Sequence, residues 1–219
     1  MTKEFSFEQT RLIGVFLEKE KTTPDQYPLS INAMTNACNQ KSNRDPVVNF
    51  SESQVQNIVD ELIKLRVLQL VSSPSARAAK YKHRFCGSDF SLFDLSPAQS
   101  AIICLLFLRG AQTPGELRTR TQRLYAFSDV AQVEETLSEM AHSEDPMVKK
   151  LPREAGKRES RYIHLFTSDD EIAKYDNLTD ANTAQASLHP DEQQRIEQLE
   201  QEVAQLKTEI AQIKEALDL

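Results

Sequence analysis

The sequence has few of the residues that catalytic and metal-binding motifs require. Its 219 residues include three cysteines, four histidines and five glycines. The cysteines Cys38, Cys86 and Cys104 are odd in number and far apart, which excludes a disulfide framework and a zinc motif and predicts reduced, partly buried thiols. The glycines form no phosphate-binding loop, and no nucleophile–base pair is apparent. We therefore expect a protein that is not an enzyme and uses no cofactor.

Long apolar runs are missing as well. No stretch reaches the roughly 20 apolar residues of a membrane helix, and residues 1–5 lack the apolar core of a signal peptide. With 39% hydrophobic and 27% charged residues, most of the chain should fold in water. These absences predict a cytoplasmic protein.

The net charge of −7 is distributed unevenly along the chain. Residues 169–219 carry four bases against thirteen acids, whereas residues 1–168 carry 22 bases against 20 acids and are close to neutral. The acidity therefore belongs to the tail. A nearly neutral body permits nucleic-acid binding but does not by itself indicate it.

An internal repeat with a shift of 90 residues divides the body into two copies. Residues 6–9 and 96–99 are both Ser-x-x-Gln capping boxes, which satisfy free amide groups at a helix start, and an apolar helical stripe follows each. Thr23-Pro24 then matches Thr113-Pro114 without a gap. Such a repeat predicts that one structural unit is built twice.

Each copy predicts three helices followed by two strands. The expected helices are 6–20, 29–39 and 51–66 in the first copy and 96–109, 114–123 and 128–142 in the second, with strands at 67–72, 79–85, 147–152 and 160–166. This order is typical of a winged helix-turn-helix domain. We therefore expect a mainly α fold with small β-hairpins (α+β). Its predicted parts are winged-helix domains over 1–88 and 89–168, an acidic linker over 169–190 and a coiled-coil helix over 191–219.

The last segment carries an unbroken heptad seam. Its apolar residues recur at spacings of three and four: Ile196, Leu199, Val203, Leu206, Ile210, Ile213 and Leu217. β-branched residues at the a positions, with mostly leucine at d, favour a parallel dimer, and the expected g–e′ charge pairs are opposite in sign. About three heptads is short for a coiled coil. A lone amphipathic helix lying on its own body therefore stays the alternative to a homodimer.

Candidate nucleic-acid contacts occur in both copies. Gln54 and Asn57 lie on the third helix of the first copy and offer polar groups to base edges. Basic residues are candidates for phosphate contacts, with solvated surface charge as the alternative. They are Lys41 and Arg44 in the loop 39–50, Arg77, Lys80 and Lys82 in the first wing, Arg118, Arg120 and Arg123 on the second middle helix, and Arg153, Lys157, Arg158 and Arg161 in the second wing.

Two features limit this interpretation. The third helix of the second copy carries acids and no base, so it would repel phosphates in the usual docking mode. The side chains of the loop 39–50 suit hydrogen bonds that cap helices, which is the alternative to a binding role for Lys41 and Arg44.

Four strings resemble the YceH-like family of bacterial proteins. They are Thr22–Ser30, Ala37–Val47, Arg109–Arg118 and Gly156–Tyr162, and the resemblance extends over residues 7–168. It implies a tandem winged-helix protein of a family without an assigned activity, so it supplies no catalytic residues. The first wing departs from the glycine-containing turn that the resemblance implies, because it reads Ser73–Arg77. That departure leaves phosphate contacts by Arg77 in doubt.

Two classes of function follow. A winged-helix protein of the transcription-regulator kind would bind double-stranded DNA, and a dimer would favour a palindromic site. A protein–protein interaction scaffold would instead use the tandem winged helices without contacting DNA. Strong dependence of binding on salt would distinguish the first class from the second.

Overall fold

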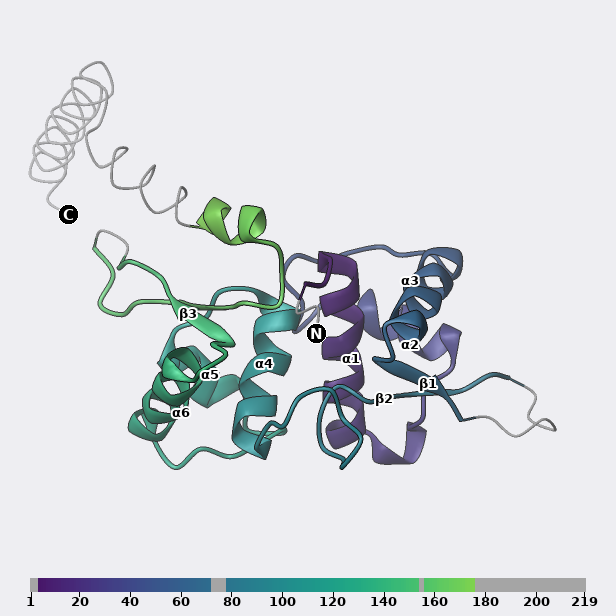
Figure 1. The fold of residues 1–219 in the computed structure, drawn as a ribbon, viewed down its shortest axis with the longest axis horizontal. Helices are drawn as coiled ribbons and strands as arrows, with labels where there is room; N and C mark the ends of the chain where they lie inside the picture. The colour runs from purple at the N-terminus through teal and green to yellow at the C-terminus, as the bar shows by residue number, and fades with distance from the viewer. Residues whose placement is uncertain (1–3, 72–77, 154–155, 176–219) are drawn as a thin grey trace, which may run out of the picture.

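The computed structural model describes residues 4–71, 78–153 and 156–175, which form helices and two small antiparallel sheets (Figure 1). The first half contains α1 (Phe7–Thr22), the 3-10 turn η1 (Pro24–Gln26), α2 (Ile31–Cys38), α3 (Glu52–Lys64), β1 (Leu68–Leu70) and β2 (Tyr81–His83). The second half contains α4 (Pro97–Arg109), α5 (Pro114–Arg120), α6 (Val130–His142), β3 (Val148–Lys150) and β4 (Tyr162–His164). The predicted α+β class, with its order of three helices and two strands in each half, is confirmed.

The predicted tail lies mostly outside the described residues. The heptad seam and its dimer remain predictions, because residues 176–219 are not among those described. Residues 169–175 are helical, so the linker that the sequence predicts from residue 169 begins instead with a helical turn.

The capping boxes that open α1 and α4 are confirmed. The Ser6 hydroxyl accepts the Gln9 N–H at 3.2 Å, and the Gln9 side chain accepts the Ser6 N–H at 3.1 Å. Ser96 and Gln99 form the same reciprocal pair at 3.2 and 3.0 Å. Each box satisfies two amide groups that a helix start leaves without partners. The two long helices of the repeat therefore begin in the same way.

The two Thr-Pro pairs, in contrast, have different roles. Thr113 is the N-cap of α5 and forms a capping box with Glu116. Thr23 precedes only η1, and α2 begins later with Ser30 as its N-cap. The sequence match is therefore correct in position, but the first half inserts a turn before its second helix.

A tyrosine ties each sheet to the segment before the second helix. Tyr81 exchanges two backbone hydrogen bonds with Leu29, at 2.8 and 3.0 Å. Tyr162 exchanges two with Gln112, at 2.8 and 3.1 Å. The strands that carry these tyrosines are β2 and β4. On their other edges they pair with β1 and β3, respectively. Each sheet is thus anchored to its own helices in the same way.

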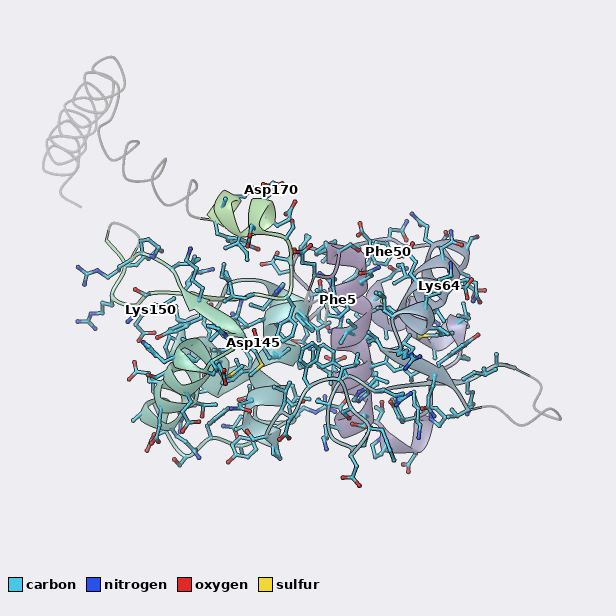
Figure 2. All side chains as sticks on the ribbon, in the orientation of Figure 1. Phe5, Phe50, Lys64, Asp145, Lys150 and Asp170 are labelled. Carbon is cyan, nitrogen blue, oxygen red and sulfur yellow. The ribbon has the colours of Figure 1, made fainter. Side chains whose placement is uncertain are left out.

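The two halves share one hydrophobic core. Helices α1 and α4 lie side by side at the centre of the molecule (Figure 1). The rings of Phe85, Phe107 and Phe166 lie within 5.5–5.7 Å of each other, so residues from both hairpins and from α4 meet. Phe5 lies between the halves (Figure 2), because its ring contacts Phe85 and its N–H donates to Phe166 at 3.1 Å.

Candidate nucleic-acid interface

The hairpin of the second half carries an exposed group of basic side chains. Arg153, Lys157 and Arg158 are exposed on the connection between β3 and β4. Arg161 is only half-buried, and its guanidinium donates to the Ala111 carbonyl at 3.2 Å. We call Arg153, Lys157 and Arg158 the hairpin bases. They keep the position that the sequence predicts, while Arg161 fastens the hairpin to the turn between α4 and α5.

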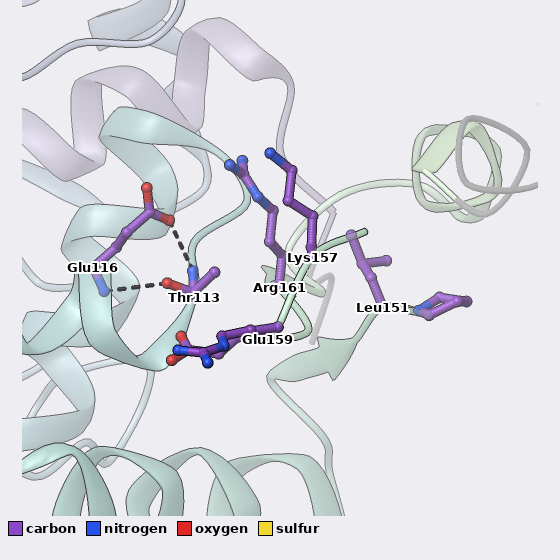
Figure 3. Close-up of a pocket in the computed structure, with 8 residues that line it drawn as sticks. Thr113, Glu116, Leu151, Lys157, Glu159 and Arg161 are labelled. Carbon is purple, nitrogen blue, oxygen red and sulfur yellow. Dashed lines mark hydrogen bonds between the residues drawn. The ribbon is translucent and has the colours of Figure 1, made fainter. Parts of the chain in front are cut away.

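A shallow pocket of about 290 Å³ lies at the base of this hairpin. Figure 3 shows Lys157 and Arg161 side by side in its wall, with their charged groups on the same side. Glu116 and Glu159 also line it, so the pocket is mixed in charge. The hairpin bases therefore suit an extended anion that passes over the hairpin better than a small one held in this pocket.

A larger cleft of about 750 Å³ lies between the two halves. Five basic side chains line it: Lys19 and Lys41 from the first half, and Arg109, Arg120 and Arg123 from the second. Glu18 is the one acid among the described residues of its wall. The sequence predicted Lys41, Arg120 and Arg123 as separate contacts, and the structure brings them together. Two further bases in the cleft, Lys19 and Arg109, were not predicted from the sequence. Each lies in the last turn of its helix, α1 or α4, and a basic residue at that position is the signal that could have identified it.

Of the two alternatives for Arg44, a nucleic-acid contact or a structural role in the loop, its surroundings favour the structural role. Arg44 is only 5% exposed, and its guanidinium donates two hydrogen bonds to the Glu18 carboxylate, at 2.7 and 3.1 Å. It also donates to the carbonyl of Ala37 at 3.0 Å. Burial alone would raise the pKa of Glu18, but the hydrogen bonds and charge of Arg44 lower that pKa below its usual value. Arg44 therefore stabilises the loop 39–50 from within.

The other hydrogen bonds of that loop also hold its shape. The Asn39 side chain exchanges two hydrogen bonds with the backbone of Phe50, both at 2.8 Å, and so closes the loop at its ends. The Asp45 N–H donates to the Leu108 carbonyl at 2.9 Å, which fastens the loop to α4. Lys41 stays exposed at the cleft. The loop is therefore a structural bridge that presents one basic side chain.

The bases of α5 differ in how far they are engaged. Arg118 is half-buried and donates to the Ser128 carbonyl at 3.1 Å, which ties α5 to the start of α6. Arg120 pairs with Glu116 at 3.2 Å and donates to the Gln112 side chain. Arg123, just beyond the helix, is exposed. Of the three predicted bases, Arg123 is therefore best placed to meet a ligand.

The candidates on α3 and on the first hairpin belong to elements at the opposite end of the molecule from the second hairpin (Figure 1). Lys80 and Lys82 are exposed on or beside β2, and Arg77 falls outside the described residues. On α3, Asn57 is exposed, while the side-chain oxygen of Gln54 is occupied by the Ser51 N–H at 2.8 Å. The predicted contacts therefore do not form one surface but separate groups on the two halves and in the cleft.

The acidic face predicted for the third helix of the second half is present on α6. Asp129 is its N-cap, and Glu134, Glu135 and Glu139 are exposed along it. A row of carboxylates repels phosphates at close range. This helix therefore does not suit the major groove.

The thiols show no sign of activation. Cys38, Cys86 and Cys104 are free and buried, and burial raises the pKa of each, that of Cys38 to about 12. A nucleophilic cysteine requires a lowered pKa. Among the described residues, no group of three His, Cys, Asp or Glu side chains is placed to hold a metal ion.

None of the helices in the described part of the chain combines the length and the apolar character needed to cross a membrane.

Comparisons with known proteins give the relationship of the chain. The family model described as "Protein of unknown function, DUF480" matches residues 5–157. A "UPF0502 protein" of Colwellia psychrerythraea is 54% identical over 184 residues, which cover 84% of this chain and 81% of the relative. Proteins with the same description from Shewanella piezotolerans and Vibrio campbellii are 50% and 51% identical, over 90% and 92% of this chain and 91% and 90% of their own lengths. These matches agree with the YceH-like resemblance of the sequence, and the chain belongs to the DUF480/UPF0502 family of bacterial proteins.

Proposed function

We propose that the chain is a non-enzymatic, tandem winged-helix protein that binds double-stranded DNA through phosphate contacts. The observation that carries this proposal is the exposure of Arg153, Lys157 and Arg158 together on one hairpin. Basic side chains on a hairpin can contact phosphates and orient a protein on a duplex without reading its sequence.

The order of elements supports the winged-helix interpretation. In each half, three helices precede a two-stranded antiparallel sheet, and an isolated bridge adds the segment before the second helix to that sheet. The connection between β3 and β4 then takes the place of the wing. In Figure 1 it extends from the body at the end away from α3.

The charge of α6 determines how this half would approach DNA. Its exposed carboxylates oppose insertion into the major groove, where a recognition helix is usually found. The hairpin bases would instead lie along the phosphate backbone, with α6 turned away. Binding of this kind depends steeply on salt and weakly on base sequence.

A duplex titration tests the proposal. Fluorescence anisotropy with a random duplex is measured at several salt concentrations, for the full chain and for a triple variant, Arg153→Glu with Lys157→Glu and Arg158→Glu. Each phosphate contact contributes about 0.9 to the slope of log K against log salt. The triple variant should therefore bind much more weakly and lose up to about 3 from the slope, at roughly 0.9 for each base.

A matched control separates local contacts from total charge. The variant Lys21→Glu with Lys64→Glu and Lys174→Glu makes the same change in net charge at exposed positions that are not part of the hairpin. It should keep most of the affinity. Equal weakening by the two triple variants, or no binding of the unaltered chain at micromolar concentration and low salt, would reject the proposal.

The acidic face of α6 favours a second candidate function, a protein interaction scaffold with a basic partner. Under that hypothesis Glu134, Glu135 and Glu139 contact the partner, and DNA has no role. Pull-down from lysate with nuclease present, using the full chain and a variant with these three residues changed to Gln, tests it. A specific protein captured only by the unaltered chain would support the scaffold, and unchanged capture would reject it.

A further inference from the structure

The cleft between the halves has the size of a small-molecule site. Its volume of about 750 Å³ lies within the roughly 300–1,000 Å³ that ligand pockets occupy. Its walls come from the end of α1, the loop 39–50, the end of α4 and α5 with the residues after it. A molecule bound there would contact both halves at once.

The charge of the cleft is strongly positive. Lys19, Lys41, Arg109, Arg120 and Arg123 line it. Glu18, the acid in the same wall, pairs with the buried Arg44 at 2.7 Å and with Lys19 at 3.2 Å, so it offsets part of the charge of Lys19 but not that of the other lining cations. Arg120 is balanced in part by Glu116 at 3.2 Å. Cations that line one concave site without matching acids favour an anion that neutralises several of them.

Arg109 shows the excess of positive charge in the cleft most directly. Its Nη2 donates to the Asn43 side chain across the two halves, while its buried Nε has no hydrogen-bond partner among the described residues. Burial and the neighbouring charges of Arg120 and Arg44 lower the pKa of the guanidinium. An anion beside Arg109 would offset the repulsion among these cations.

The site is held in place before any ligand arrives. The Asn39–Phe50 hydrogen bonds and the Asp45–Leu108 hydrogen bond fix the loop against α4. Lys41 on that loop and Arg109 on α4 therefore keep their separation without a ligand. Preorganised positive groups bind anions more tightly, because less side-chain freedom is lost on binding.

The remaining lining residues indicate the class of ligand. Ser42 adds a hydroxyl, whereas the hydroxyls of Thr22 and Thr23 donate to backbone carbonyls of α1. No aromatic side chain is among the described residues that line the cleft. Stacking on an aromatic ring is the usual means of holding a base. We propose that the cleft binds a compact polyanion with clustered phosphoryl groups, recognised by charge and hydrogen bonding and not by a base. This site is separate from the hairpin that carries the proposed DNA binding.

Inorganic tripolyphosphate is the probe for this site. Calorimetric titration of the full chain at low ionic strength compares the unaltered protein with the double variant Lys41→Glu, Arg123→Glu. Both residues are exposed, so the variant should fold normally. We expect the dissociation constant to rise at least tenfold in the variant. Tripolyphosphate should also raise the melting temperature of the unaltered chain, because the ligand binds only the folded cleft.

A second double variant, Arg153→Glu with Arg158→Glu, makes the same charge change on the hairpin. It should alter the tripolyphosphate dissociation constant less than twofold. Absence of binding at millimolar tripolyphosphate, or equal weakening in both variants, would overturn the proposal. The tripolyphosphate titration contains no duplex, so its result does not depend on whether the proposed DNA binding is correct.

A duplex titration of the same variants identifies the source of the phosphoryl groups. If the cleft variant binds duplex as the unaltered chain does, the site serves a free polyanion. If it loses affinity for duplex and tripolyphosphate in parallel, the phosphoryl groups come from a nucleic-acid backbone. Both results support the cleft as the phosphoryl site.

Discussion

Gly14 and Cys104 occupy the same position in the two copies of the repeat, 90 residues apart, and they are in contact. The Cys104 thiol donates to the Gly14 carbonyl at 3.4 Å, at the centre of the interface between α1 and α4. The two copies therefore pack through equivalent positions. The absence of a side chain at Gly14 permits this close approach.

Substitution of Gly14 by alanine should destabilise the fold. A methyl group there would lie 2.9 Å from side-chain atoms of Leu108 and 3.0 Å from Phe107 Cβ. Overpacking of a core costs roughly 1–3 kcal/mol, which outweighs the gain of up to about 1 kcal/mol from alanine in a helix. Urea unfolding should show a net loss of about 1 kcal/mol in the free energy of unfolding. Gly115→Ala is the control, since among the described residues its methyl group would meet the Glu159 carboxylate at an ordinary contact distance of 3.5 Å, and it should not destabilise the fold.

Removal of the Arg44 guanidinium should reduce stability without affecting DNA affinity. Arg44→Met removes the two hydrogen bonds of the guanidinium to the Glu18 carboxylate, whose side chain is 15% exposed, and leaves Lys19 at 3.2 Å from it. Breaking a buried ion pair on one side costs on the order of 3 kcal/mol. Chemical denaturation measures this loss, and the double variant Glu18→Gln, Arg44→Met should recover part of it. Weaker duplex binding with unchanged stability would instead indicate that Arg44 contacts DNA.

Stability should fall as the pH drops below neutrality, in part through His164. Burial lowers the pKa of His164 to about 4, below the value of about 6.5 for an unfolded chain. Between these values the unfolded state binds the additional proton, so the contribution is complete above pH 6.5 and is lost towards pH 4. His164→Gln should flatten this part of the profile in urea unfolding at several pH values. A His164→Gln variant with the same pH profile as the unaltered chain would contradict this origin of the loss.

Deletion of residues 191–219 should convert a dimer into a monomer. The heptad seam from Ile196 to Leu217 predicts a parallel two-stranded coiled coil. Light scattering should give the mass of a dimer for the full chain and of a monomer for the shortened one. A full chain that is already monomeric would favour the alternative, in which the helix lies on its own body.

Local signals in the sequence predicted the helices and strands well. The burial of Arg44 and the cleft were not predicted, because both depend on contacts between segments that are far apart in the sequence. A capping box such as Ser6–Gln9 depends on residues three apart, so its pattern alone determined where the helix begins. The burial of Arg44 depends on Glu18, which is 26 residues away on another element. The cleft likewise requires α1, α4, α5 and the loop 39–50 to meet, and no short window of sequence contains that arrangement.

The ring cluster of Phe85, Phe107 and Phe166 has a consequence for inheritance. After a duplication, each copy could in principle be lost, exchanged or joined to another protein. Here the loss of one copy would expose the aromatic rings of the other copy that it now covers. We therefore expect the two copies to be retained together, because loss of either one would expose this cluster to water.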